Sequence, residues 1–127
     1  MKRILVVDDD RSVLQVLTRA LFDYDVTVAR DGFEALVAAR RLDRLDLLIT
    51  DYLMPSMIGD ELIARVRQQQ PHVPVLIVTG HTEILDREAA PWWTASAHLG
   101  KPFQLAALRE QVGLLTGHAT ASANAAE

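Results

Sequence analysis

The sequence predicts an α/β protein, a three-layer α/β/α sandwich built around a five-stranded parallel sheet. Short apolar runs alternate along the chain with segments whose apolar residues recur at helical spacing, which is typical of successive βαβ units. The runs at residues 47–49 and 75–78 are wholly apolar and suit strands that are buried on both faces. A chain of 127 residues, half of them apolar, suits one domain with a real core.

Three of the five expected strands lie in the first half of the chain, at residues 2–7, 25–29 and 46–51. A helix follows the first strand, and Asp10 supplies a side chain suited to its N-cap. The apolar residues of this helix recur at helical spacing: Val13, Val16, Leu17, Ala20 and Leu21. A second helix is expected over residues 33–41, with four residues spaced around one side: Phe33, Leu36, Val37 and Arg40.

The second half of the chain supplies two more strands, at residues 75–79 and 95–100, and three helices, at residues 59–69, 83–90 and 103–116. Pro91 is expected to stop the middle helix and Gly117 to end the last one. Because βαβ crossovers are right-handed, the natural strand order is the flavodoxin-like 2-1-3-4-5. Residues 1–117 then form one domain, and residues 118–127, which lack an apolar pattern, are expected to be a disordered tail.

The composition argues against several classes of function. The net charge of −4 argues against a basic face for phosphate contacts, so direct binding to nucleic acid is not expected. The chain contains no cysteine, which rules out disulfides and thiolate metal sites. No apolar run approaches the roughly 20 residues that a membrane span needs. The first apolar stretch, at residues 4–7, is too short for a signal peptide, so we expect a cytoplasmic protein.

Acidic side chains follow the first and third strands. These strands are neighbours in the 2-1-3-4-5 order, so Asp8, Asp9 and Asp51 are expected to converge at one edge of the sheet. Carboxylates at such distances repel one another unless a cation joins them, and Mg²⁺ is the natural choice. Thr79 and Lys101 stand at the ends of the fourth and fifth strands, at the same edge. This set suits phosphoryl transfer with Asp51 as the acceptor, because that reaction needs mainly positioning and charge neutralisation.

Four motifs, in order and at strand ends, make the chain resemble the receiver domain of bacterial two-component response regulators. They are the Ile-Leu-Val-Val-Asp-Asp-Asp run at 4–10, the Thr-Asp-Tyr-Leu-Met-Pro run at 50–55 with Gly59, the Val-Thr-Gly run at 78–80, and the Lys-Pro-Phe run at 101–103. The resemblance covers residues 2 to about 116. In this family the bond before the proline is usually cis, so the same geometry is expected at residues 101–102.

The resemblance implies a role for each acidic residue. Asp51 matches the phosphoacceptor, which is charged by the phosphohistidine of a sensor histidine kinase or of a histidine phosphotransfer protein. Asp9 and Asp51 match direct Mg²⁺ ligands, with the backbone carbonyl of Leu53 as a third, and Asp8 matches an acid that reaches the metal through water. The chain would then be a signalling domain and not an enzyme, catalysing only its own phosphorylation and autodephosphorylation.

The resemblance also implies roles for residues around the phosphoryl group. Thr79 matches the switch hydroxyl that moves toward this group, and Lys101 matches the ammonium beside it. The switch aromatic of the family is His98 in this chain. Leu53 and His81 occupy the positions that tune loss of the phosphoryl group. Because a leucine cannot orient an attacking water, we expect slow autodephosphorylation.

Two adjacent tryptophans, Trp92 and Trp93, depart from the family pattern, which has small residues shortly before the fifth strand. Both rings cannot easily point inward, so at least one is expected on the face formed by the fourth helix, the fifth strand and the fifth helix. Receivers use this face to bind partners, where tryptophan often anchors an interface. The resemblance therefore implies a downstream protein partner and leaves a phosphorylation-dependent homodimer open.

Other interpretations stay open at this point. The Asp8–Asp10 run also resembles the haloacid-dehalogenase phosphatases, in which Asp8 would be the nucleophile, although the chain is short for that family. A degenerate, unphosphorylated binding module is a third interpretation. The chain could also be a stand-alone receiver, a relay to a histidine phosphotransfer protein, or a receiver cut from a longer protein.

Overall fold

The computed structural model describes residues 1–80 and 97–117. The helix expected at residues 83–90 and the tail expected at 118–127 lie outside the described residues. In chain order the elements are β1 (Arg3–Val7), α1 (Arg11–Ala20), β2 (Asp25–Ala29), α2 (Gly32–Arg41), β3 (Leu47–Thr50), α3 (Gly59–Gln69), β4 (Val75–Thr79), β5 (Ala97–Gly100) and α5 (Leu105–Thr116). None of the described helices is long and apolar enough to cross a membrane.

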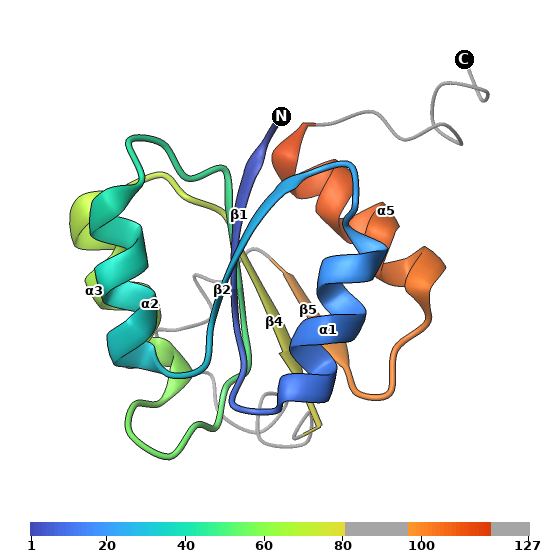
Figure 1. Ribbon diagram of the computed structural model, residues 1–127, viewed down its shortest axis with the longest axis horizontal. Helices are drawn as coiled ribbons and strands as arrows, with labels where there is room; N and C mark the ends of the chain where they lie inside the picture. Colours follow the sequence, from blue (N-terminus) through green and yellow to red (C-terminus); the bar gives the residue numbers. More distant parts are fainter. Residues whose placement is uncertain (81–96, 118–127) are drawn as a thin grey trace.

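The five strands form one open parallel sheet with the order β2-β1-β3-β4-β5, as the sequence predicts. Helices α2 and α3 cover one face of the sheet, and α1 and α5 cover the other (Figure 1). The observed strands and helices start and end within a few residues of the expected ones. The three-layer α/β/α architecture is therefore confirmed for the described part of the chain.

The sheet separates two apolar cores, because successive side chains of a strand point to opposite faces. In β1, Leu5 and Val7 pack with α2 and α3, whereas Ile4 and Val6 pack with α1 and α5. Every residue of β3 and β4 is buried, which explains why these strands read as continuous apolar runs. Burial on both faces fixes the strand ends, and with them the edge at which the acidic residues emerge.

The buried face of α2 differs from the expected one. Phe33 and Val37 are exposed, and the helix instead packs through Ala35, Leu36 and Ala39. Of the large apolar residues expected on this face, Leu36 is buried between the alanines, whereas Phe33 and Val37 are exposed. The expectation was wrong for Phe33 and Val37 because hydrophobic spacing does not show that small alanines form the buried face.

Helix α1 starts immediately after the acidic run. Asp10 is its N-cap, as expected, and accepts a hydrogen bond from the backbone N–H of Ser12 at 2.9 Å. The buried residues of α1 include Leu14 and Leu17, whereas Val16, which the pattern had placed inward, is exposed. The cap thus fixes the point at which the chain turns from the edge of the sheet into the helix.

Candidate functional site

The sheet positions three of the candidate residues through backbone hydrogen bonds that continue the strand pairing by one residue. The N–H of Asp8 donates to the last carbonyl of β2 at 3.1 Å, and the N–H of Asp51 donates to the last carbonyl of β1 at 3.0 Å. The N–H of Lys101 donates to the last carbonyl of β4 at 2.8 Å. All three residues therefore stand at the carboxyl edge of the sheet. The Lys101–Pro102 peptide bond is cis, as expected.

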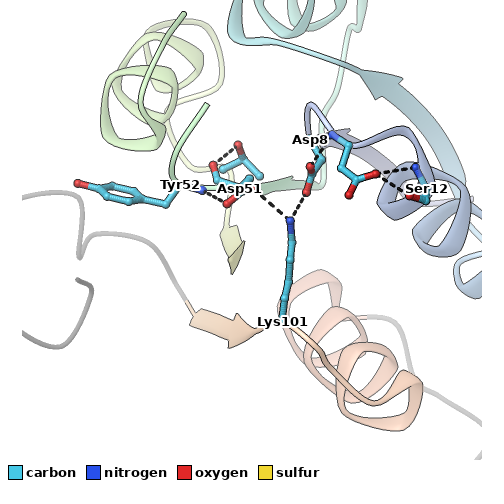
Figure 2. A network of polar contacts seen from close by, with 7 residues as sticks. Asp8, Ser12, Asp51, Tyr52 and Lys101 are labelled. Atoms are coloured by element: carbon cyan, nitrogen blue, oxygen red, sulfur yellow. Dashed lines mark hydrogen bonds and ion pairs between the residues drawn. The ribbon is translucent and has the colours of Figure 1, made fainter. Parts of the chain in front are cut away.

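An ammonium joins two carboxylates at the centre of this edge (Figure 2). Lys101 Nζ lies 2.7 Å from Asp8 Oδ2 and 3.1 Å from Asp51 Oδ2. Asp9 completes the acidic group: one carboxylate oxygen from each of Asp8, Asp9 and Asp51 lies within 4.8 Å of the others. Asp8 is 1% exposed and Asp51 8%, whereas Asp9 is open to solvent.

The second oxygen of each buried carboxylate is held by a backbone N–H. Asp8 Oδ1 accepts a hydrogen bond from the N–H of Asp10 at 2.9 Å, and Asp51 Oδ1 accepts one from the N–H of Tyr52 at 2.7 Å. Both carboxylates therefore have a fixed orientation. Sequence reasoning missed these donors, because every non-proline residue has an N–H and no side chain marks the ones that turn toward a carboxylate.

Burial and charge act against each other in the site. Burial raises the pKa of Asp8, and the hydrogen bond from Lys101 offsets only part of that rise. Burial by itself would lower the pKa of Lys101, but its contacts with the carboxylates of Asp8 and Asp51 outweigh that effect and raise this pKa. The Lys101 ammonium therefore stays charged. The other lysine, Lys2, precedes β1 and so lies at the opposite edge of the sheet.

The donor set of Asp8, Asp9 and Asp51 fits a hard divalent cation. When all three carboxylates are ionised, they carry two more charges than the single ammonium that contacts them, and all the ligand atoms of these side chains are oxygens. Oxygen ligands around such a charge suit Mg²⁺, and the exposed position of Asp9 gives access from solvent. The site can thus bring a metal ion, an ammonium and a reactive carboxylate together at one point.

The register of β4 and β5 relates Thr79 to His98. Thr79 is fully buried at the end of β4 and is paired with Gly100. His98 is paired with Ile77, two residues earlier on both strands, so the side chains of Thr79 and His98 lie on the same face of the sheet. His98 is exposed at this edge strand.

The remaining candidates divide into one described residue and three undescribed ones. Leu53 lies two residues after Asp51 and is 37% exposed. His81, Trp92 and Trp93 lie outside the described residues, so their expected roles are not tested by the structure.

Gly59 ties the loop after β3 to the start of α3. Its N–H donates to the carbonyl of Tyr52 at 2.7 Å. A Cβ at this position would lie 3.1 Å from the Cα of Tyr52 and 3.2 Å from the carbonyl oxygen of Asp51. Only a residue without a side chain lets the helix approach the backbone of Asp51 this closely, which explains the glycine after the Asp51 motif.

Comparison with known proteins gives one family over most of the chain. The family model for the response regulator receiver domain matches residues 4–113. Response regulator MprA of Mycobacterium leprae is 38% identical over 115 residues, covering 89% of this chain and 50% of the relative. MprA of Mycolicibacterium vanbaalenii is 36% identical over 127 residues, covering 98% of this chain and 54% of the relative. The chain spans about half the length of the curated relatives that it matches.

Solved structures resemble the chain over a similar range. The chemotaxis response regulator CheY4 of Vibrio cholerae has a TM-score of 0.80 and 34% identity, covering 91% of this chain and 98% of that one. The response regulator TrrA of Thermotoga maritima, solved in complex with Mg²⁺-BeF, has a TM-score of 0.80 and 31% identity, covering 91% and 99%. These neighbours share the fold described above.

Proposed function

The chain belongs to the response regulator receiver domain family, and on this premise we propose that Asp51 is its phosphoacceptor. The observation that carries the proposal is the contact of Asp51 Oδ2 with Lys101 Nζ at 3.1 Å, beside the carboxylates of Asp8 and Asp9. We assign residues 1–117 to one receiver unit. The phosphoryl donor is the phosphohistidine of a sensor histidine kinase or of a histidine phosphotransfer protein. We place the chain in the cytoplasm, where such kinases use ATP.

Asp8, Asp9 and Asp51 would hold Mg²⁺, together with the backbone carbonyl of Leu53. Asp9 and Asp51 act as direct ligands, and Asp8, whose Oδ2 is bound to Lys101, acts through water. When bound, the ion neutralises phosphoryl oxygens and orients them for in-line transfer. The Mg²⁺-BeF complex of the Thermotoga maritima relative supports this choice of metal.

The transfer step uses groups that are already in place. A carboxylate oxygen of Asp51 attacks phosphorus, the bond between phosphorus and the donor histidine nitrogen breaks, and that nitrogen keeps the electron pair. Lys101 Nζ donates to a phosphoryl oxygen while it keeps its contact with Asp8 at 2.7 Å. The Thr79 hydroxyl donates to another phosphoryl oxygen. The chain thereby acts as a signalling domain, and its own phosphorylation and autodephosphorylation are the only reactions that it promotes.

Phosphorylation changes the output face through residues of β4 and β5. Movement of Thr79 toward the phosphoryl group changes the space beside His98, which lies on the same face of the sheet. The output is a change in the face that includes β5 and α5, where a downstream protein binds or a second copy of the chain docks. Trp92 and Trp93 would extend this face, and His81 and Leu53 would tune loss of the phosphoryl group.

The test is the intact mass of the protein after incubation with acetyl phosphate, with and without Mg²⁺. The wild type is expected to gain about 80 Da, one phosphoryl group, only when Mg²⁺ is present. Asp51→Asn should gain nothing, and Asp43→Asn, a matched change at an exposed aspartate, should behave as the wild type. An adduct that persists in Asp51→Asn would overturn the assignment of the acceptor. Hydrolysis of a small phosphoester that survives Asp51→Asn but is lost in Asp8→Asn would instead indicate a phosphatase.

The side chain of Leu53 allows a second test of the same site. It has no polar atom with which to position an attacking water two residues after Asp51. The phosphorylated protein is therefore expected to lose its phosphoryl group slowly, and Leu53→Asn is expected to lose it faster. A wild-type half-life of seconds, measured by the decay of the mass adduct, would refute this role.

A further inference from the structure

A surface groove lies between α1 and the edge strand β2, on the face of α1 that looks toward β2. Its volume is ≈ 460 Å³, and it is lined by residues of α1, β2 and α2 and by Arg30 between β2 and α2. None of the residues assigned above to phosphoryl transfer lines it. The groove is therefore a feature that the proposed chemistry leaves unexplained.

Arginines give the groove a charge opposite to that of the whole protein. Arg11, Arg19 and Arg30 line it, and Glu34 is the acidic residue among its lining residues. The groove thus carries a local charge of +2 on a chain whose net charge is −4. Glu34 is engaged with Arg30, since its carboxylate accepts the Arg30 N–H at 3.1 Å and lies 3.8 Å from its guanidinium. Neither Arg11 nor Arg19 has a carboxylate partner among the described residues.

Val28 and Leu14 are the apolar residues that line the groove. Val28 is paired with Val6 of β1, whose side chain packs with α1, so Val28 points to the same face and lies beside Leu14. Val28 lies on the edge strand β2 and is 46% exposed. An apolar patch flanked by Arg11 and Arg19 suits a ligand that has both carboxylates and an aliphatic side chain.

We propose that this groove binds an acidic peptide segment of a partner protein, with an aliphatic side chain of the segment against Val28 and its carboxylates on Arg11 and Arg19. A protein segment fits better than a nucleic acid, because the lining residues include no aromatic ring on which a base could stack, whereas Val28 offers a contact for an aliphatic side chain. The site begins next to the acidic edge, since Arg11 directly follows the N-cap Asp10. Binding nevertheless needs no phosphorylation of the chain.

The test uses a short fluorescein-labelled peptide that alternates glutamate with leucine, titrated with the full chain at low salt and followed by fluorescence anisotropy. We expect saturable binding that weakens as the salt concentration rises. The double variant Arg11→Gln/Arg19→Gln should bind at least about fivefold more weakly. Arg40→Gln/Arg41→Gln removes the same charge from exposed positions on α2 and should bind as the wild type does. In NMR spectra, the peptide should shift the methyl resonances of Val28.

Four results would overturn the proposal. They are no saturable binding, equal weakening by both double variants, equal affinity for a peptide that alternates glutamate with serine, and equal affinity for a single-stranded oligonucleotide. The same titration of Asp51→Asn separates this inference from the proposed phosphoacceptor role. Retained binding in that variant is expected, whatever the mass experiment shows for Asp51, and loss of binding there would count against an independent groove.

Discussion

Replacing Lys101 with methionine should destabilise the protein strongly, because it leaves two carboxylates facing each other without their cation. Asp8 is almost fully buried, and its Oδ2 is bound to the ammonium at 2.7 Å, with Asp51 Oδ2 at 3.1 Å. Methionine keeps most of the unbranched side chain, which is one atom shorter, and removes the charge and the hydrogen bonds. The variant therefore measures what the ammonium contributes, separately from packing.

The size of the effect follows from burial. Removing one partner of a buried ion pair costs about 3–5 kcal/mol, because the other charge is left buried and unpaired. The side chain of Lys101 is 22% exposed, so water takes over part of its role. We expect the free energy of unfolding to fall by about 2–4 kcal/mol at neutral pH. With an m-value of about 1.5 kcal/mol/M, the urea midpoint falls by about 1.3–2.7 M.

The loss of stability in Lys101→Met should depend on pH in a definite direction. Burial raises the pKa of Asp8 in the folded protein above its ordinary value of 3.8, and loss of Lys101 raises it further. An acid with a raised folded-state pKa gains stability as the pH falls from that pKa toward its unfolded value, because the folded state then binds more protons. The deficit of Lys101→Met should therefore shrink as the pH is lowered from neutrality toward 3.8.

The assay is urea unfolding without divalent metal, followed by circular dichroism at several pH values. Lys2→Met is the matched control, since it removes the same charge from the only other lysine and should cost little. A deficit for Lys101→Met no larger than that of the control would refute the reasoning. So would a deficit that grows as the pH falls.

Three further substitutions test other contacts by urea unfolding. Gly59→Ala should cost about 1–3 kcal/mol and slow the phosphorylation measured by mass, because the new methyl group would lie 3.2 Å from the carbonyl oxygen of Asp51. Asp10→Ala removes the N-cap of α1 and should cost about 1 kcal/mol, whereas Asp10→Asn should be nearly neutral. Arg109→Met breaks a bidentate pair with Asp23 at 2.9 and 3.0 Å and should lower the free energy of unfolding by about 1 kcal/mol. A double-mutant cycle with Asp23→Asn should assign most of this loss to the pair.

The acidic edge was predictable because the sequence marks it twice. A wholly apolar run specifies a strand with both faces buried, and the first charged residue after it specifies the point of exit from the sheet. Asp8 and Asp51 both stand at such points, and their strands are neighbours in the flavodoxin-like order, one of the few orders that right-handed crossovers allow. Convergence of the two carboxylates on Lys101 therefore followed from the order of elements, without any knowledge of distances.

Other features depend on neighbours that no local pattern reveals. The buried face of α2 is made by Ala35 and Ala39, and hydrophobic spacing cannot distinguish an alanine that permits close approach from one that merely continues the helix. The groove beside β2 depends on Arg19 and Arg30, which lie on different elements and come together only through the β1–β2 register. Positions of this kind are set by tertiary packing and become visible only in the folded chain.

The contact between Lys101 and Asp8 also sets the order in which the protein can become active. It joins residues 93 positions apart, and its companion contact with Asp51 spans 50 positions. A nascent chain therefore displays every acidic ligand well before the ammonium leaves the ribosome, and β5 must join the sheet before the charge is balanced. A copy that ends before residue 101, or in which β5 has not paired, has the Asp51 carboxylate without the ammonium that contacts it. Under the proposed mechanism, the chain can therefore receive a phosphoryl group only after β5 has been synthesised and has joined the sheet.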